Sequence, residues 1–294
     1  MADTLFGRFT IIGAGLMGTS LALALRQTGV VTHVELYDRS PEALKAAARR
    51  HAAHGYEHDL ATAVRDAGAI CLATPVGTFA DLVAGMASHL APGVVVTDLG
   101  SVKSVMRRAA LPDLPGHAVL VPAHPLAGSE KAGADAADAA LFHGALVLLT
   151  PDKEAPREAV ERIRALWHAV GAETREMPAD VHDAALAWTS HLPQVAASAL
   201  ASVLGQRADA WGESLYALSG RGLDDTTRLA ASDPDMWADI LDANRAHVHE
   251  AVVVLRACLD ELAAALARGD RARARRLVES GRTARRRYEA GRAP

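Results

Sequence analysis

The chain has 294 residues, more than one small hydrophobic core needs, which favours two domains. Hydrophobic residues make up 50% of it and aromatic residues only 4%, a composition typical of an alanine-, valine- and leucine-rich α/β protein with added helices. The 31 basic and 35 acidic residues give a formal net charge of -4, which argues against nucleic acid as the main partner because phosphate backbones attract basic surfaces.

The start of the chain and its cysteines both indicate a reducing compartment. Residues 1–13 contain no long apolar region and no cleavage site of a secretory signal. Cys71 and Cys258 are too few to form a disulfide framework. No apolar run reaches the roughly 20 residues that a spanning helix needs. We therefore expect a soluble, cytoplasmic protein with no membrane partner.

Short apolar runs alternate with helical stretches through the first part of the chain. The runs cover residues 9–12, 34–37, 69–73, 94–97, 118–121 and 145–149. Residues 16–27 have a helical pattern that ends at Gly29, and an alanine-rich tract at 132–140 is expected to form one more helix. This alternation predicts an α/β fold with a Rossmann-type, doubly wound, mainly parallel sheet.

After Met177 the pattern becomes entirely helical. Residues 184–204, 236–266 and 271–288 are rich in alanine, leucine and arginine at helical spacing. We place the boundary there, with a dinucleotide-binding domain at 1–177 and an all-α domain at 178–294. Residues 237–266 are expected to form one long helix, apolar over much of its surface. That pattern indicates burial in a bundle or against a second subunit, so we expect a homodimer through the helical domain.

The run GAGLMG at residues 13–18 follows one predicted strand and opens the next predicted helix. In this G-x-G-x-x-G pattern Gly13 permits a tight turn, Gly15 leaves room for a pyrophosphate, and Gly18 lets helix and strand pack closely. Leu16 and Met17 begin the helix, whose free N–H groups and dipole attract phosphate. We predict a dinucleotide site here, the alternative being a turn that binds no ligand.

The neighbouring strand ends supply further candidate cofactor contacts. Asp38 ends the second predicted strand, 20 positions after Gly18, where a carboxylate can bind the ribose hydroxyls of NAD and repel the 2′-phosphate of NADP. Arg39 could pair with that phosphate, so NADP stays the alternative to NAD. Thr74 and Pro75 follow the third clear run and are expected to line the nicotinamide side of the crevice, or else to form a plain turn.

Two polar segments also follow predicted strands, TDLGSVK at 97–103 and AHPLAGSE at 123–130. The carboxyl ends of strands in such a sheet face one crevice. The imidazole of His124, with an ordinary pKa near ~6.5, can accept a proton at neutral pH, although a histidine before Pro125 can also be structural. Because Ser101 is available on the neighbouring strand end to orient His124, we assign both to catalysis.

These segments resemble the prephenate and arogenate dehydrogenase family. GAGLMGTSLA, ATPV, DLGSVK, HPLAGSE, SHLP and DDTTRLAASDPDMW occur there in this order, and the likeness spans residues 9–251. The pair of DLGSVK and HPLAGSE is the specific part. The resemblance implies a Rossmann domain followed by a helical domain that dimerises. It also implies oxidative decarboxylation of prephenate to 4-hydroxyphenylpyruvate, or of arogenate to tyrosine, with hydride transfer to NAD.

The resemblance further implies a place in tyrosine biosynthesis and a role for individual residues. His124 would bind the ring hydroxyl of the substrate and take its proton, with Ser101 supporting it. His191 and Arg228 would contact the substrate from the helical domain. The residues after Gly222 depart from the family pattern, so the choice between prephenate and arogenate as substrate stays open.

The remaining polar candidates each have a structural alternative. Arg228 suits a carboxylate because a guanidinium binds it bidentately and stays charged. We aim it at the side-chain carboxylate of the substrate; its alternative is a pairing with a nearby aspartate. His191 could instead be a satisfied helical histidine. Ser129 and Glu130 are placed at the crevice rim as substrate contacts, although Glu130 could be a solvated charge.

Two other functions compete with this one. A β-hydroxyacid dehydrogenase of similar layout would use a lysine on a helix after the boundary, but no lysine follows Lys153. A nicotinamide-binding regulator without turnover would have no reason to direct His191 and Arg228 at the crevice. A metal is not expected, because His51, His54 and His58 lie in a polar stretch without a carboxylate framework.

Overall fold

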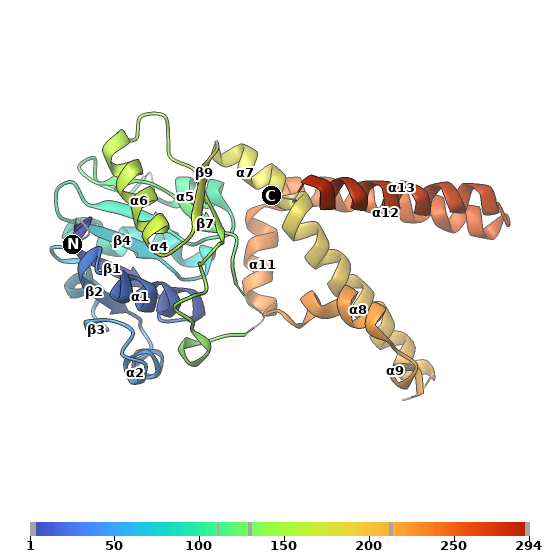
Figure 1. Cartoon of the computed structure of the whole chain (residues 1–294), viewed down its shortest axis with the longest axis horizontal. Coiled ribbons are helices and arrows are strands. Elements are labelled where there is room, and N and C mark those ends of the chain that lie inside the picture. Colours follow the sequence, from blue (N-terminus) through green and yellow to red (C-terminus); the bar gives the residue numbers. More distant parts are fainter. Residues whose placement is uncertain (1–3, 111, 129–130, 212–213, 292–294) are drawn as a thin grey trace. The chain divides into compact units, whose positions relative to one another are not determined.

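The computed structural model describes residues 4–110, 112–128, 131–211 and 214–291 (Figure 1). They form two compact units, Met1–Arg245 and Ala246–Pro294. The larger unit contains two sheets and the helices from α1 (Leu16–Thr28) to α11 (Pro234–Ala243).

A parallel six-stranded sheet forms the centre of the larger unit. Its strands in chain order are β1 (Phe6–Ile12), β2 (Val31–Tyr37), β3 (Gly55–Glu57), β4 (Ala69–Leu72), β5 (Val95–Asp98) and β6 (Val119–Leu120). Their spatial order is β3-β2-β1-β4-β5-β6, with every neighbouring pair parallel. The order reverses between β1 and β4, the point at which doubly wound sheets bind ligands. The predicted Rossmann-type sheet is confirmed.

Both faces of this sheet are buried, which explains why most of its strands contain short apolar runs. Side chains alternate between faces, so Ile11 belongs to one hydrophobic cluster and Ile12 to the other. Three helices contribute to the first cluster, α1, α2 (Pro41–Arg49) and α6 (Arg157–Ala169). Three others contribute to the second, α3 (Leu60–Val64), α4 (Phe79–Met86) and α5 (Lys103–Ala110).

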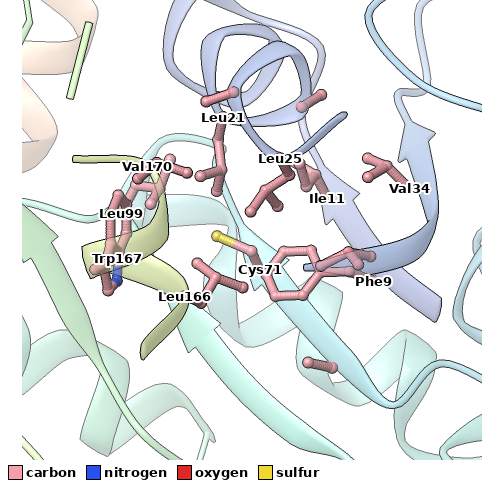
Figure 2. Packing of buried hydrophobic residues seen from close by; sticks show 14 of the residues in the cluster. Phe9, Ile11, Leu21, Leu25, Val34, Cys71, Leu99, Leu166, Trp167 and Val170 are labelled. Carbon is pink, nitrogen blue, oxygen red and sulfur yellow. The ribbon is translucent and has the colours of Figure 1, made fainter. Parts of the chain in front are cut away.

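The first hydrophobic cluster packs α1, near the start of the chain, and α6, much later in the chain, against the same face of the sheet. Figure 2 shows Leu21 and Leu25 of α1 together with Ile11 and Cys71 of the strands, and with Trp167 of α6. All five side chains are at most 1% exposed. Their burial fixes α1, and with it the glycine loop that precedes α1.

A second sheet of three strands follows along the chain. It consists of β7 (Ala123–Pro125), β8 (Leu146–Leu149) and β9 (Glu173–Glu176), with β8 antiparallel to β7 and parallel to β9. The run at 145–149 is thus a strand, but it lies outside the main sheet. Strands β3, β7 and β9 were not predicted, because each has only three or four residues and none is a continuous apolar run. His124 lies within β7, whereas the sequence placed it directly after a predicted strand.

The predicted helix at 132–140 is wrong. Only Ala134–Ala136 forms a single 3-10 turn, and Gly133 before it has a φ of 80°. The Asp138 carboxylate accepts the N–H of Ala140, and the N–H of Asp138 donates to Ser20 Oγ. Such bonds between side chains and backbone compete with helical ones.

The last part of the larger unit is helical, as predicted. Helix α7 (Ala179–Leu186) passes through one π-helical turn (Ala187–His191) into α8 (Leu192–Trp211), which is followed by α9 (Ser214–Ala217), α10 (Arg221–Thr227), a 3-10 turn (Arg228–Ala231) and α11. The single helix predicted at 237–266 is wrong, because α11 ends before Asn244 and α12 (Arg245–Ala267) begins after it. The Asn244 side chain bonds to groups outside the helix, which favours a break there.

The smaller unit contains α12 from Ala246 onward and α13 (Arg271–Gly291), which lie side by side (Figure 1). Gly269, with a φ of 65°, reverses the chain between them, and Arg273 pairs with Glu261 across the two helices. Within the described ranges, no helix has both the length and the apolar character that crossing a membrane requires. Cys71 and Cys258 are both free thiols.

Candidate active site

The glycine loop between β1 and α1 has the backbone of a dinucleotide-binding turn. Gly13 has a φ of +116°, and a Cβ there would lie 2.8 Å from the carbonyl oxygen of Ala73. A Cβ on Gly18 would collide with the Gly13 carbonyl. By contrast, no atom lies within 4 Å of the place that a Cβ on Gly15 would take. The open position is the N-cap of α1, so the loop fits a pyrophosphate laid against the helix start.

The first turn of α1 lies beside the segment that carries His124. Leu16 and Met17 are half-buried there, and the start of the helix has no side-chain cap. A Cβ on Gly128 would lie 4.0 Å from Met17 Sδ. The two motifs, more than a hundred residues apart in the sequence, are therefore neighbours in space.

Asp38 follows β2 and is bound to the glycine loop. The N–H of Ala14 donates to its Oδ2 at 2.8 Å, and the N–H of Ser40 donates to its Oδ1 at 2.8 Å. Each carboxylate oxygen keeps a second lone pair, which a ribose hydroxyl can use. The next residue, Arg39, is exposed.

The turn after β4 borders the same loop. A Cβ on Gly13 would lie 3.0 Å from Thr74 Cγ2, and Thr74 Oγ1 is 2.7 Å from Thr78 Oγ1. Pro75 is exposed at the tip of this turn. Helix α11 reaches the same turn, since a Cβ on Gly77 would lie 2.9 Å from Asp239 Oδ2. Thr74 thus lies beside the glycine loop.

A buried ion pair joins β5 to β7. Lys103 Nζ is 2.5 Å from Asp98 Oδ2 and 2.6 Å from the carbonyl oxygen of Ala123, and both charged side chains are 0% exposed. The N–H of Ala123 in turn donates to Asp98 Oδ1 at 3.2 Å. Burial lowers the pKa of Lys103 and raises that of Asp98, while their mutual attraction opposes both shifts. The pair fixes the backbone directly before His124.

His124 is the first member of a chain of three hydrogen-bonded side chains. Its Nδ1 is 2.8 Å from Nε2 of His182 on α7, and Nδ1 of His182 is 2.8 Å from Asp183 Oδ1. Asp183 also accepts the N–H groups of Lys103 at 2.8 Å and Ser104 at 2.9 Å, at the start of α5. The chain therefore connects the second sheet to the helical region through an anchored carboxylate.

The charges around His124 keep its ring neutral. Burial lowers the pKa of His124 well below its ordinary value; its electrostatic interactions with Lys103, His182 and His191 act in the same direction, and Asp183 opposes them. Burial also disfavours ionised Asp183, but hydrogen bonds from His182, Ser104 and Lys103 outweigh it and bring the pKa of Asp183 to about 2. At neutral pH the neutral imidazole of His124 is thus connected to the ionised carboxylate of Asp183 through two successive hydrogen bonds, with His182 between them.

His191 presents a hydrogen-bond donor from the π-helical turn. Asn244 Nδ2 donates to the carbonyl oxygen of Asp183 at 2.8 Å and lies 3.1 Å from His191 Nδ1, so that nitrogen must accept. The pKa of His191 falls to about 4, mainly through burial, with Asp183 opposing the shift. The neutral ring therefore carries its hydrogen on Nε2, which is buried and has no partner in the described part of the chain. Trp237 packs edge-on against the ring, with centroids 5.9 Å apart.

The other predicted site residues form no hydrogen bond with His124 in the described part of the chain. Ser101 is half-buried between β5 and α5, and no hydrogen bond within residues 4–110 and 112–128 joins it to His124. Arg228 is exposed on a turn that Gln194 holds through the carbonyl oxygen of Leu229, at 2.9 Å. Among residues 214–291 Arg228 forms no ion pair with a neighbouring aspartate. Ser129 and Glu130 lie outside the described residues.

Several polar residues of this region were missed in the sequence, although signals for them existed. Asp98 and Lys103 flank Ser101 in the DLGSVK segment, and a lysine directly after an apolar strand and turn needs a partner if buried. His182-Asp183 is an adjacent pair at the start of a predicted helical stretch, and Asn244 interrupts an apolar helix pattern. The sequence did not reveal which of these residues contact each other, because His124 and His182 are 58 positions apart and Lys103 and Asp183 are 80 positions apart.

No metal cluster forms from the histidines at 51–58 within the described ranges, where no three His, Cys, Asp or Glu side chains come together suitably. His54 instead accepts the N–H of Val34 through Nδ1 at 3.0 Å.

Comparison with known proteins covers both parts of the chain. The family model described as prephenate dehydrogenase, nucleotide-binding domain, matches residues 21–176, and the one described as prephenate dehydrogenase, dimerization domain, matches residues 178–280. The cyclohexadienyl dehydrogenase of Zymomonas mobilis is 36% identical, over 82% of this chain and 82% of its own length. The prephenate dehydrogenase of Bacillus subtilis is 32% identical, over 83% of this chain and 65% of its own length.

Solved structures agree with this likeness. A prephenate dehydrogenase from Aquifex aeolicus, in complex with hydroxyphenyl propionate and NAD+, superposes with a TM-score of 0.86 at 28% identity, covering 96% of this chain and 98% of that one. The arogenate dehydrogenase of Synechocystis superposes with a TM-score of 0.78 at 27% identity, covering 96% and 99%. The chain belongs to the prephenate dehydrogenase family.

Proposed function

We propose that this oxidoreductase converts prephenate to 4-hydroxyphenylpyruvate, or arogenate to tyrosine, by oxidative decarboxylation with NAD. The observation that carries the proposal is a neutral, buried His124 beside the glycine loop, with ionised Asp183 behind it. The named substrates of the relatives and the NAD+ held by the Aquifex aeolicus enzyme support the same assignment.

The substrates have a ring hydroxyl at one end, and a carboxylate with a side chain at the other. His124 takes the hydroxyl proton while the ring carbon loses a hydride, so that a ketone forms. Bound NAD would supply the acceptor for that hydride. The ketone then draws in the electron pair that carbon dioxide leaves behind, and the ring becomes an aromatic phenolate. His124 can return its proton to the phenolate oxygen, which leaves the enzyme ready for another turnover.

The helical residues would orient the substrate. His191 offers an Nε2–H donor with no protein partner in the described ranges, which suits a substrate oxygen. Arg228 would hold the side-chain carboxylate bidentately. An ion pair to the departing carboxylate would instead stabilise the ground state and slow its loss. Ser101 remains proposed as a support of the reacting hydroxyl, and Ser129 and Glu130 as rim contacts.

NAD is favoured over NADP by the carboxylate at position 38. Two backbone N–H groups hold Asp38 at the edge of the glycine loop, where its charge would repel a 2′-phosphate. Arg39 is exposed next to it and would be the group that accommodates NADP if that assignment failed.

We further propose a dinucleotide-binding domain at 1–177 and a helical domain at 178–294 that forms a homodimer. The last strand, β9, ends at Glu176, and the two family models meet between residues 176 and 178. The dimer rests on the description of the second family model. A cytoplasmic location stays a prediction.

The direct test is a paired assay. Prephenate and arogenate are each offered with NAD and with NADP, while reduced nicotinamide is followed by absorbance and the product by chromatography. We expect NADH together with an equal amount of 4-hydroxyphenylpyruvate or tyrosine. Turnover of β-hydroxyacids but of neither cyclohexadienyl acid would contradict the proposal, and so would cofactor binding without any turnover.

A further inference from the structure

We propose that His182 and Asp183 determine which nitrogen of His124 acts as the base. They are positioning residues, because they act through His124 and do not themselves meet the substrate. The inference deepens the proposed function and rests on it only for the role of His124. The tautomer itself can be measured without turnover.

The direction of each hydrogen bond follows from the carboxylate end. Ionised Asp183 can only accept, so Nδ1 of His182 must carry the hydrogen of their 2.8 Å bond. A neutral His182 then has its lone pair on Nε2. That lone pair faces Nδ1 of His124 at 2.8 Å, so His124 carries its hydrogen on Nδ1. The lone pair of His124 is thereby left on Nε2, the nitrogen that the proposed reaction needs as a base.

The first link of this chain is held rigidly. Asp183 is only 2% exposed, and its carboxylate accepts two N–H groups from the first turn of α5. Its backbone carbonyl accepts Asn244 Nδ2 at 2.8 Å. The carboxylate therefore cannot rotate away from His182 without losing its bonds to Lys103 and Ser104, and the backbone behind it is held by Asn244.

The middle link lies where water does not compete. His182 is 0% exposed and His124 is 8% exposed, and their rings meet edge to face with centroids 5.0 Å apart. The bond joins α7 to β7 across 58 positions of sequence. A histidine that served only to fill space would not need an ionised carboxylate on its far nitrogen.

The chain also has a role after proton transfer. When Nε2 of His124 takes the hydroxyl proton, the ring becomes a cation that faces the ammonium of Lys103 and the imidazoles of His182 and His191. Among the described residues that influence it, Asp183 is the group that favours the charged form. His182 links that carboxylate to His124, so the cation is stabilised without placing a carboxylate against the substrate.

The competing account makes Asp183 a helix cap and nothing more. Its bonds to the N–H groups of Lys103 and Ser104 would then stabilise α5, and His182 would be a packing residue. The two accounts differ in what happens when the acceptor on His182 is removed while the cap stays.

The variants His182→Leu and His182→Gln make this distinction. Leucine removes the acceptor and leaves a buried Nδ1–H without a partner, so the tautomer with its hydrogen on Nε2 becomes favoured. We expect kcat to fall about 100-fold, with the KM of the substrate unchanged within about threefold. Glutamine can present its amide oxygen to His124 Nδ1–H, and we expect it to restore at least about tenfold of that loss. His168→Leu, a histidine on α6 bonded to Thr174, is the matched control and should leave kcat unchanged.

Asp183→Asn adds a readout that a cap would not affect. Loss of the Asp183 charge, which raises the pKa of His124, should move the acid limb of the kcat profile to lower pH. An unchanged acid limb, or equal losses in His182→Leu and His182→Gln, would overturn the proposal and leave the capping role alone.

The final test is nitrogen NMR on wild-type protein with ¹⁵N-labelled histidine, with and without NAD. The signals of His124 are identified by their loss in His124→Gln. We expect Nδ1 to be protonated and Nε2 to be unprotonated at pH 7.5. A hydrogen on Nε2 overturns the proposal even if the enzyme turns over. Conversely, the expected tautomer in a protein without dehydrogenase activity would sink the proposed function and leave the hydrogen-bond chain standing.

Discussion

The glycine loop and the surroundings of His124 are two parts of one site that are built in opposite ways. The proposed phosphate-binding surface of the loop is formed by residues that are close in sequence. It consists of backbone N–H groups and of glycines, which have no side chain to block a ligand. Around His124, buried side chains from β5, α5, β7 and α7 meet across as many as 80 positions of sequence. The first kind of site depends on a short segment of the chain, whereas the second depends on the whole unit being folded.

The difference has a physical cause. A phosphate needs only converging N–H groups and space, which a short turn can supply. A base that stays neutral and correctly protonated at neutral pH needs burial, and burial in turn requires that every polar partner be satisfied. We therefore expect substitutions around His124 to affect chemistry or stability, and substitutions in the loop to affect cofactor affinity.

The largest effect is expected at His124 itself. His124→Gln removes the base, so kcat should fall by about 10³- to 10⁴-fold. The dissociation constant of NAD should stay within about threefold, because the glycine loop is untouched. Steady-state kinetics and calorimetric titration measure the two quantities. A comparable loss of NAD affinity would show that the two regions are not separable.

Lys103→Met should be the most destabilising single substitution in the network. It leaves buried Asp98 without its partner, which costs about 3–5 kcal/mol of unfolding free energy. The double variant Asp98→Leu with Lys103→Met should recover part of that loss, because no charge remains buried. Urea unfolding gives both values. A single variant as stable as the wild type would mean that the ion pair is not what holds β5 against β7.

Gly18→Ala tests the local region. The added Cβ would collide with the Gly13 carbonyl and force the loop open, so we expect NAD affinity to fall about 100-fold. Gly7→Ala in β1 introduces the same methyl group where no atom lies within 4 Å and should leave NAD affinity unchanged. Equal effects from the two variants would remove the special role of the loop.

Arg228→Ala should act on substrate binding. Loss of a charge-assisted contact to a carboxylate should raise the KM of the substrate about tenfold, with a smaller change in kcat. Arg221→Ala, at the start of α10, the helix directly before the turn that carries Arg228, is the control for the loss of an exposed positive charge. An unchanged KM in Arg228→Ala would end its assignment as the anchor.

The smallest expected effect is one of pH. Because burial lowers the pKa of His124 well below its ordinary value, the ring stays unprotonated as the pH falls from 8 to 6.5. Activity is lost only when the pH falls through that lowered pKa. We therefore expect kcat to fall by less than about a tenth across this interval, whereas a base with the ordinary pKa near ~6.5 would lose about half of its activity. The pH profile of kcat decides between them.

Sequence reasoning succeeded where structure is local and failed where it is not. The Rossmann-type sheet and the glycine loop were predicted from short apolar runs and from one six-residue motif at 13–18. The helix at 132–140 and the unbroken helix at 237–266 were wrong, because Asp138 and Asn244 use their side chains outside the helical pattern. The Asp138 bond is local, whereas the partners of Asn244 lie 53 and 61 positions away, where neighbouring residues gave no indication of them.

The catalytic region shows the same limit. His124 could be singled out from its place after a strand, and Ser101 was the polar neighbour that sequence order suggested for it. The partner of His124 Nδ1 is instead Nε2 of His182, because α7 packs where β5 and β7 end. No spacing rule links position 124 to position 182, so only the folded chain could identify this partner.

The central claim is that Nε2 of His124 meets the ring hydroxyl of the substrate. A crystal structure of the enzyme with NAD and 4-hydroxyphenylpyruvate tests it most directly. We expect the phenolic oxygen within about 3.2 Å of His124 Nε2, with the nicotinamide against the ring carbon that bears it. A phenol bound elsewhere, or a His124 side chain turned away from it toward the protein interior, would contradict the account.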